Sequence, residues 1–408
     1  MKFTGICAAE ILLPNTDDMT AWACVACDQF TGEPEYWHEL DKQTKGKTRA
    51  LDLILPEAFL SEDNSALINK INANITAYLE QGKFNKLDEG FILTVRQTPY
   101  VERRIGLIAT VDLEQYDYKA SAKPLIRATE GTVEERIPPR LKIRKDAEVE
   151  LPHVMILFDD EKREITEKLY ENRNSYQKVY DFDLNMNGGH VEGYFIPNSA
   201  EVLSAFGKLL DSERLIKKYG KEDNFVFAVG DGNHSLATAK AHWNVVKENL
   251  TSEQKLSHPA RFALAEFVNI YDEGIYFEPI FRFVKGVNVD KFLSGLKEVD
   301  CGDIGIYALQ KTTAQKGNNS LPEGIKATDE YIKNYISEFG GEVDYIHGES
   351  NLFKLVDGAK NAVGILFNKL DKSELFRYVS SKGAFPRKTF SMGEGIEKRY
   401  YLEARKIK

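Results

Sequence analysis

The most chemically suggestive stretch of this sequence is Gly230-Asp231-Gly232-Asn233-His234-Ser235. It stands between an apolar run and an amphipathic one, so we expect a strand, a tight turn and a helix. Glycine permits such a turn and lets a ligand approach the backbone closely. The unpaired N–H groups and the positive dipole end of the helix would face a bound anion, and phosphate is its natural identity.

The side chains of this turn suggest roles around that phosphate. Asp231 could hold a magnesium ion that bridges phosphate oxygens, and Asn233 and His234 could donate hydrogen bonds to them. The stretch is neither a Walker loop nor a dinucleotide-binding fingerprint. Spacing alone therefore leaves a second interpretation open, in which nothing binds and Asp231 or Asn233 only caps the helix.

A second group of candidates lies near the N-terminus. Cys24 and Cys27 have a spacing used in metal and redox sites, but no second pair completes a zinc set, so two small core residues are the simpler interpretation. Asp28 follows in a polar and aromatic stretch. It either faces a cleft and binds substrate or caps a turn.

Two further loops carry residues that could bind substrate. The stretch Asn187-Gly188-Gly189-His190 could bring His190 to the site as a substrate loop, or it could be a hairpin turn with an exposed histidine. Arg387 and Lys388, beside Thr389, could clamp a phosphate or carboxylate, although a solvated basic turn is the default.

These residues need a scaffold, and the apolar pattern predicts a mixed α/β chain. Leu236, Ala239, Trp243, Val246 and Leu250 step by three or four and predict a helix after the turn. A turn at 271–274 is expected to join the strands at 262–270 and 275–284. The other expected strands are 91–95, 105–111, 154–158, 193–197, 225–229 and 353–356, and the other expected helices are 65–80, 161–180 and 328–339.

Length and charge limit the class of protein. The chain has 408 residues, which suggests two or three domains, and we expect α+β regions at 1–115 and 289–408 around a central domain at 116–288. The net charge of −9 opposes nucleic-acid binding. No apolar run is long enough to span a membrane, Glu10 interrupts the N-terminal apolar run, and four cysteines are too few for a disulfide scaffold. We expect a cytoplasmic protein that binds neither membranes nor nucleic acids.

Several motifs together carry a family resemblance. The Asp231 turn and its flanks resemble the Asp-Gly-His-His-Arg signature of the uncharacterised bacterial family called domain of unknown function 1015, or DUF 1015. Further matches to this family are Ala26-Cys27-Asp28-Gln29-Phe30, Glu33-Pro34-Glu35-Tyr36-Trp37, Arg127-Ala128-Thr129-Glu130, Asn187-Gly188-Gly189-His190, Phe277-Glu278-Pro279-Ile280, Asp344-Tyr345-Ile346-His347 and Pro386-Arg387-Lys388-Thr389-Phe390-Ser391. The resemblance covers nearly the whole chain, but the family name states no function.

A more distant resemblance implies an activity. The order of short strand, acid with nearby threonine, helix, strand and Asp-Gly turn is similar to the ParB/sulfiredoxin-like superfamily, which includes kinases of free serine. This resemblance implies that residues 116–288 form such a domain, with Glu130 as general base and His234 as a donor to the transferred phosphoryl group. The implied phosphate and nucleotide contacts are Gly230, Gly232, Asn233, Ser235, Arg127, Thr129, Thr132 and Arg136.

One departure from that superfamily affects how the turn could bind phosphate. The superfamily turn usually ends in arginine, and here it ends in Ser235. A cation from elsewhere would have to replace the missing guanidinium. The candidates are Arg127, Arg136, Arg140, Lys240, Arg387 and Lys388. Glu130 also has a simpler interpretation, as a solvated carboxylate paired with Arg127 or Arg136.

The sequence therefore predicts a nucleotide-dependent phosphotransferase that acts on a small hydroxylated, serine-like metabolite. Its cofactors would be ATP or ADP with Mg²⁺. The alternative is a non-catalytic regulator that binds a nucleotide or a metabolite. Neither the acceptor nor the oligomeric state follows from the sequence.

Overall fold

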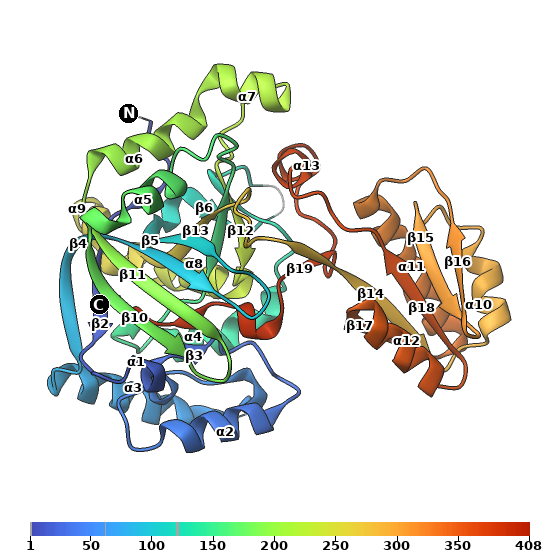
Figure 1. Cartoon of the computed structure of the whole chain (residues 1–408), viewed down its shortest axis with the longest axis horizontal. Coiled ribbons are helices and arrows are strands. Elements are labelled where there is room, and N and C mark those ends of the chain that lie inside the picture. Colours follow the sequence, from blue (N-terminus) through green and yellow to red (C-terminus); the bar gives the residue numbers. More distant parts are fainter. Residues whose placement is uncertain (1, 62, 120–121) are drawn as a thin grey trace. The chain divides into compact units, whose positions relative to one another are not determined.

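The computed structural model describes residues 2–61, 63–119 and 122–408, which form two compact units (Figure 1). Unit 1 comprises Met1–Ile275 and Glu394–Lys408, and unit 2 comprises Tyr276–Gly393. Strands from both sides of the expected boundary at residue 115 share one sheet in unit 1. The division into three regions stays a prediction.

Unit 1 is built around an eleven-stranded sheet. The main path runs β10-β11-β4-β5-β13-β9-β12-β7-β6, with β1 paired to β5 and β2 to β4. The strands are β1 (Ile6–Cys7), β2 (Ala9–Pro14), β4 (Phe84–Gln97), β5 (Arg104–Asp112), β6 (Tyr116–Asp117), β7 (Ile126–Ala128), β9 (Met155–Phe158), β10 (Gln177–Leu184), β11 (Gly189–Pro197), β12 (Phe227–Asp231) and β13 (Phe262–Asn269). Two short ladders pair β3 (Cys24–Val25) with β20 (Tyr400–Tyr401) and β8 (Val149–Glu150) with β21 (Arg405–Lys406).

Helices and two apolar cores complete unit 1. One core contains Phe206, Phe227, Phe267 and Trp243, and the other contains Trp22, Trp37 and Tyr400, all almost fully buried. The helices are α1 (Met19–Trp22), α2 (Pro34–Thr44), α3 (Ser65–Glu80), α4 (Ile137–Arg144), α5 (Thr166–Glu171), α6 (Ala200–Gly207), α7 (Ser212–Tyr219), α8 (Asn233–Val246) and α9 (Ser252–Ser257).

The strand directions bring three chain segments to one edge of the sheet. Strands β7 and β12 are parallel, with Ala128 opposite Val229, so their carboxyl ends coincide. Strand β9 is antiparallel to β12, with Met155 opposite Asp231, so β9 begins where β12 ends. The residues after β7, after β12 and before β9 therefore lie together.

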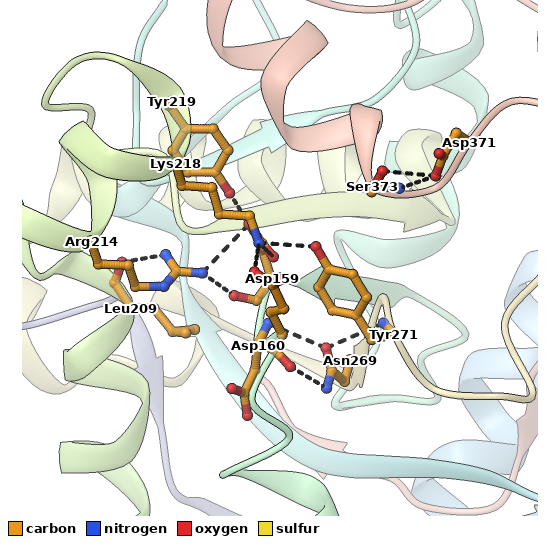
Figure 2. A network of polar contacts seen from close by, with 11 residues as sticks. Asp159, Asp160, Leu209, Arg214, Lys218, Tyr219, Asn269, Tyr271, Asp371 and Ser373 are labelled. Atoms are coloured by element: carbon orange, nitrogen blue, oxygen red, sulfur yellow. Dashed lines mark hydrogen bonds and ion pairs between the residues drawn. The ribbon is translucent and has the colours of Figure 1, made fainter.

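The other end of β9 is closed by a polar network (Figure 2). Asp159, directly after β9, is buried and accepts from Lys218 at 2.7 Å and from the hydroxyl of Tyr219. Figure 2 shows Arg214 and Lys218 pointing toward this carboxylate from α7. Asn269, at the end of β13, donates to the Asp160 carbonyl at 2.8 Å. These contacts fix α7 to the ends of β9 and β13.

Unit 2 is a smaller α/β unit with its own sheet. The order of its strands is β16-β15-β18-β14-β17, and β19 also pairs with β14. The strands are β14 (Phe277–Lys285), β15 (Ile304–Ala308), β16 (Lys311–Gln315), β17 (Glu342–His347), β18 (Ala362–Phe367) and β19 (Phe390–Met392). The helices are α10 (Val289–Leu296), α11 (Leu321–Phe339), α12 (Glu349–Gly358) and α13 (Glu374–Lys382).

The expected α/β class is confirmed, and so is the helix at 65–80. Two expectations about elements are wrong. The polar helix at 161–180 is α-helical only over Thr166–Glu171 and becomes β10 at Gln177. The expected strand at 353–356 lies in α12, because Leu352 and Val356, four residues apart, face the core together. The strands expected at 262–270 and 275–284 are confirmed as β13 and β14, and the turn between them joins two different sheets.

Candidate functional site

The turn between β12 and α8 has the expected strand–turn–helix geometry. Strand β12 ends at Asp231 and α8 begins at Asn233, with Gly232 between them in the left-handed region at φ 77°. Gly232 is the N-cap and has no side chain with which to cap α8. Neither Asp231 nor Asn233 is the N-cap residue, although Asp231 Oδ1 accepts from the N–H of the N-cap. Asn233 is 6% exposed and its Oδ1 has no hydrogen-bond partner among the described residues.

Close packing explains why glycine follows Asp231. A Cβ atom on Gly232 would lie 3.0 Å from the Cα of Val154 and 3.5 Å from the Cδ2 of His153. The backbone of the turn thus lies directly against the residues that lead into β9. Asp231 Oδ1 accepts from the Gly232 N–H at 2.9 Å, which leaves Oδ2 for other partners.

The partner of that oxygen is Lys398, which the sequence analysis did not identify. Its ammonium lies 3.1 Å from Asp231 Oδ2, and the side chains of Lys398 and Asp231 are 11% and 25% exposed. Lys398 lies just before β20, in the segment that re-enters unit 1 after unit 2. No local pattern in the sequence could have identified it, because the contact joins distant parts of the chain.

Asp28 reaches the same edge through His153, a second residue that the sequence analysis missed. Asp28 Oδ2 lies 3.7 Å from Nε2 of the buried His153, and the Tyr401 hydroxyl lies 2.9 Å from Nδ1. Burial alone would lower the pKa of His153, but the carboxylates of Asp28 and Asp231 raise it overall. Burial would raise the pKa of Asp28, but the imidazole holds it below its usual range. The site therefore favours a cationic His153 beside an anionic Asp28.

The loop after β7 is attached to the turn at two points. The Thr129 hydroxyl donates to the Val229 carbonyl at 2.6 Å. The N–H of Val133 donates to Nε2 of His234 at 3.2 Å. In this arrangement His234 is neutral and carries its proton on Nδ1. Glu130 lies between the two attachment points, and Thr132 precedes Val133, so both lie in the loop held against the turn.

Three of the cations expected to replace the missing arginine bind other groups. Arg127 pairs with Asp223 at 2.5 Å and also donates to Asn224. Arg140 pairs with Glu57. Lys240 donates to the Leu113 carbonyl at 2.7 Å, and burial lowers its pKa. Lys398 is the cation that reaches Asp231.

The remaining residues expected at the site lie in several places. Ser235 is in the first turn of α8, Gly230 is the penultimate residue of β12, and Arg136 is the N-cap of α4. Arg387 and Lys388 belong to unit 2, where the Lys388 carbonyl accepts from Arg282 at 2.9 Å.

The loop at 187–190 is a hairpin turn. It joins β10 to β11, with Leu184 opposite Gly189. His190 lies 3.0 Å from Asp181 and 2.7 Å from Asp183. Among the described residues, Asp181, His190 and Glu192 are grouped closely enough to hold a metal ion. The Lys178 ammonium already lies within 2.7 Å of both carboxylates.

Cys24 and Cys27 are free thiols. Cys24 is fully buried, and burial raises the pKa of both thiols well above the usual range. A buried thiol with a raised pKa is a poor nucleophile and a poor metal ligand. The expectation that they are core residues is confirmed for Cys24.

The fold and this edge define a mixed α/β protein in which a helix begins at a glycine N-cap beside a lysine, an aspartate and a histidine. The chain belongs to the family of proteins of unknown function DUF1015, whose match spans residues 9–375. No curated protein matches the sequence. Within the described ranges, no helix is both long and apolar enough to cross a membrane.

Solved structures give distant matches. A free serine kinase in complex with AMP shares 9% identity with a TM-score of 0.40, covering 74% of this chain and 92% of that one. SbnI from Staphylococcus aureus with a C-terminal truncation shares 10% identity with a TM-score of 0.38, covering 74% and 87%. A conserved hypothetical protein from Pyrococcus furiosus shares 11% identity with a TM-score of 0.36, covering 70% and 90%.

Proposed function

We propose that this protein is a nucleotide-dependent phosphotransferase that acts on a small hydroxylated metabolite, with serine as the type of acceptor. The observation that carries the proposal is the N-terminus of α8 behind its glycine N-cap, with the Lys398 ammonium on Asp231 beside it. The N–H groups of a helix N-terminus, the helix dipole and a nearby ammonium together favour phosphate oxygens. In this proposal Lys398 supplies the positive charge that Ser235 lacks, and residues 116–288 are the ParB/sulfiredoxin-like part of the chain.

Each group around the turn has its own role in phosphoryl transfer. The N–H groups at the start of α8 bind phosphate oxygens, and Ser235 adds a hydroxyl. Lys398 offsets the phosphate charge, and Asp231 would hold the Mg²⁺ that bridges the phosphates of ATP or ADP. His234 donates from Nδ1 to the transferred group, because its Nε2 accepts from Val133.

Glu130 is the proposed general base. It takes the proton from the acceptor hydroxyl, whose oxygen then forms the new bond to phosphorus. The electron pair of the broken P–O bond stays on the bridging oxygen of the departing nucleotide. Thr129 holds the loop that carries Glu130, and Thr132 remains a candidate nucleotide contact. Asp28 and His190 remain candidate substrate contacts. Asp28 is the best placed of these, because it lies beside His153 at the same edge.

Nucleotide binding is tested by calorimetry with ATP and with ADP, each with Mg²⁺. We expect K398M to weaken binding at least about tenfold, because it removes a charge-assisted contact. The matched control is K218M, which removes a lysine of similar exposure from Asp159 at the other end of β9. It is expected to stay within about twofold of the wild type. If neither nucleotide binds the wild type, the proposal is refuted.

Turnover separates an enzyme from a binding protein. We expect ATP or ADP consumption with at least one member of a panel of small hydroxy acids and amino alcohols. E130Q should then lose about 100-fold or more of kcat, since it removes the general base. Full activity of E130Q would exclude Glu130 from that role. Nucleotide binding without turnover would assign the protein as a nucleotide-binding regulator instead.

A further inference from the structure

We propose that Arg96 is a positioning residue, which holds the backbone at Lys398 so that its ammonium stays on Asp231. This inference rests on the proposed function for its consequence, but its structural part can be tested without nucleotide. Arg96 lies in β4 and is 5% exposed. No part of the sequence pattern singled it out.

The guanidinium of Arg96 binds four carbonyl oxygens. Three belong to consecutive residues of one segment: Ile396 at 2.6 Å, Glu397 at 3.1 Å and Lys398 at 2.5 Å. The fourth belongs to Gly188, at 3.0 Å, in the hairpin turn between β10 and β11. A planar fork of donors can fix several carbonyls at once, which a lysine ammonium on a flexible stem cannot do in the same way.

This clamp fixes the backbone from which the Lys398 side chain reaches Asp231. Two further hydrogen bonds hold this segment in place. The Glu397 side chain accepts from Thr98 at 2.7 Å and from the N–H of Glu394 at 2.8 Å. Arg96 is thus directly bonded to the residue whose side chain makes the ion pair with Asp231. It also ties the hairpin turn between β10 and β11 to the same segment.

The clamp places two positive charges close together, which costs energy. Arg96 lies directly opposite Arg104 across β4 and β5, and like charges in opposed positions repel. Burial, and then the charge of Arg104, lower the pKa of Arg96 to about 9, so it remains charged at neutral pH. Arg104 touches only the Glu397 carbonyl of this segment, at 3.0 Å, and is equally buried. It is therefore a matched control for the loss of a buried arginine.

The first measurement is the acetylation rate of Lys398 in the full chain, by mass spectrometry after brief treatment with an acyl ester. We expect Lys398 to react about fivefold faster in R96K than in the wild type, because the ammonium leaves its ion pair more often. R104K should change the rate by less than about twofold, and Lys218 serves as an internal reference in all variants. Should R96K not fold, R96Q replaces it, because its side-chain amide still donates to part of the set of carbonyls that the guanidinium binds.

The second measurement is the dissociation constant of ATP with Mg²⁺ in R96K, K398M and the double variant. We expect R96K alone to weaken binding about fivefold, and to change it less than about twofold when Lys398 is already methionine. Equal losses in both backgrounds would show a general structural role and overturn the inference. So would Lys398 acetylation in R96K that is no faster than in R104K. If the wild type binds no nucleotide, the proposed function fails while the acetylation rates still decide the role of Arg96.

Discussion

Replacing Gly232 by alanine tests whether the turn between β12 and α8 packs tightly against Val154. Two effects add. Alanine at the φ of 77° costs about 1–2 kcal/mol, because Cβ crowds the following carbonyl in the left-handed region. The new Cβ would also lie 3.0 Å from the Cα of Val154, and a backbone atom cannot swing aside. Such overpacking costs about 1–3 kcal/mol. We expect G232A to lower the free energy of unfolding by about 2–5 kcal/mol.

The chain offers a control for the first of these effects. Gly220 ends α7 at φ 75°, and a Cβ there would meet nothing within 4 Å. G220A therefore carries the conformational cost alone, about 1–2 kcal/mol. Any gain from a less flexible unfolded chain is common to both variants and cancels in their difference.

The assay is urea denaturation of both variants, followed by circular dichroism, with the midpoint and slope compared to the wild type. The steric contribution is the difference between the two losses. If G232A costs no more than G220A, the packing of the turn against Val154 is refuted. In that case the glycine would serve the backbone conformation only.

Two further predictions concern stability away from the phosphate turn. His242 is buried and its Nδ1 has no hydrogen-bond partner in the part of the chain that the structure describes; burial, followed by the charge of Arg144, lowers its pKa from 6.5 to about 4. Between these values the unfolded chain binds the additional proton, so stability should fall by about 2–3 kcal/mol as pH drops from 6.5 to 4. H242Q should reduce that slope in denaturation curves at several pH values, and an unchanged slope would contradict the assignment. D159N should lower the unfolding free energy by about 2–3 kcal/mol, because it leaves Lys218 and Tyr219 without their buried anion. E161Q, whose carboxylate is 70% exposed beside the same lysine, should cost less than about 0.5 kcal/mol, and equal losses would count against the network in Figure 2.

The local parts of the fold and the turn followed from the sequence. Apolar spacing located α3 over Ser65–Glu80 and the buried strands on either side of the site. The two glycines around Asp231 indicated a sharp turn before a helix, and Gly232 does adopt a positive φ. These features depend on residues within a few positions of one another, which is the range over which sequence patterns are informative.

Errors arose where a short segment could form more than one element. The polar stretch 161–180 lacks a continuous apolar stripe, so β10 forms there by pairing with β11. The segment 353–356 is apolar enough for a strand, but packing of Leu352 and Val356 on one face makes it part of a helix. Tertiary contacts outweigh weak local preference in both cases.

The sequence by itself determined the strand, turn and helix around Asp231 and the α/β class. Only the tertiary structure decided which charges surround that turn. Arg127, the expected substitute, is held by Asp223, and Lys398 is brought to Asp231 by the segment that Arg96 clamps. His153 lies beside Gly232 because β9 runs antiparallel to β12, and it meets Asp28 there. Ion pairs of this kind join residues 96 or more positions apart, and strand order and burial, rather than local spacing, determine which of them form.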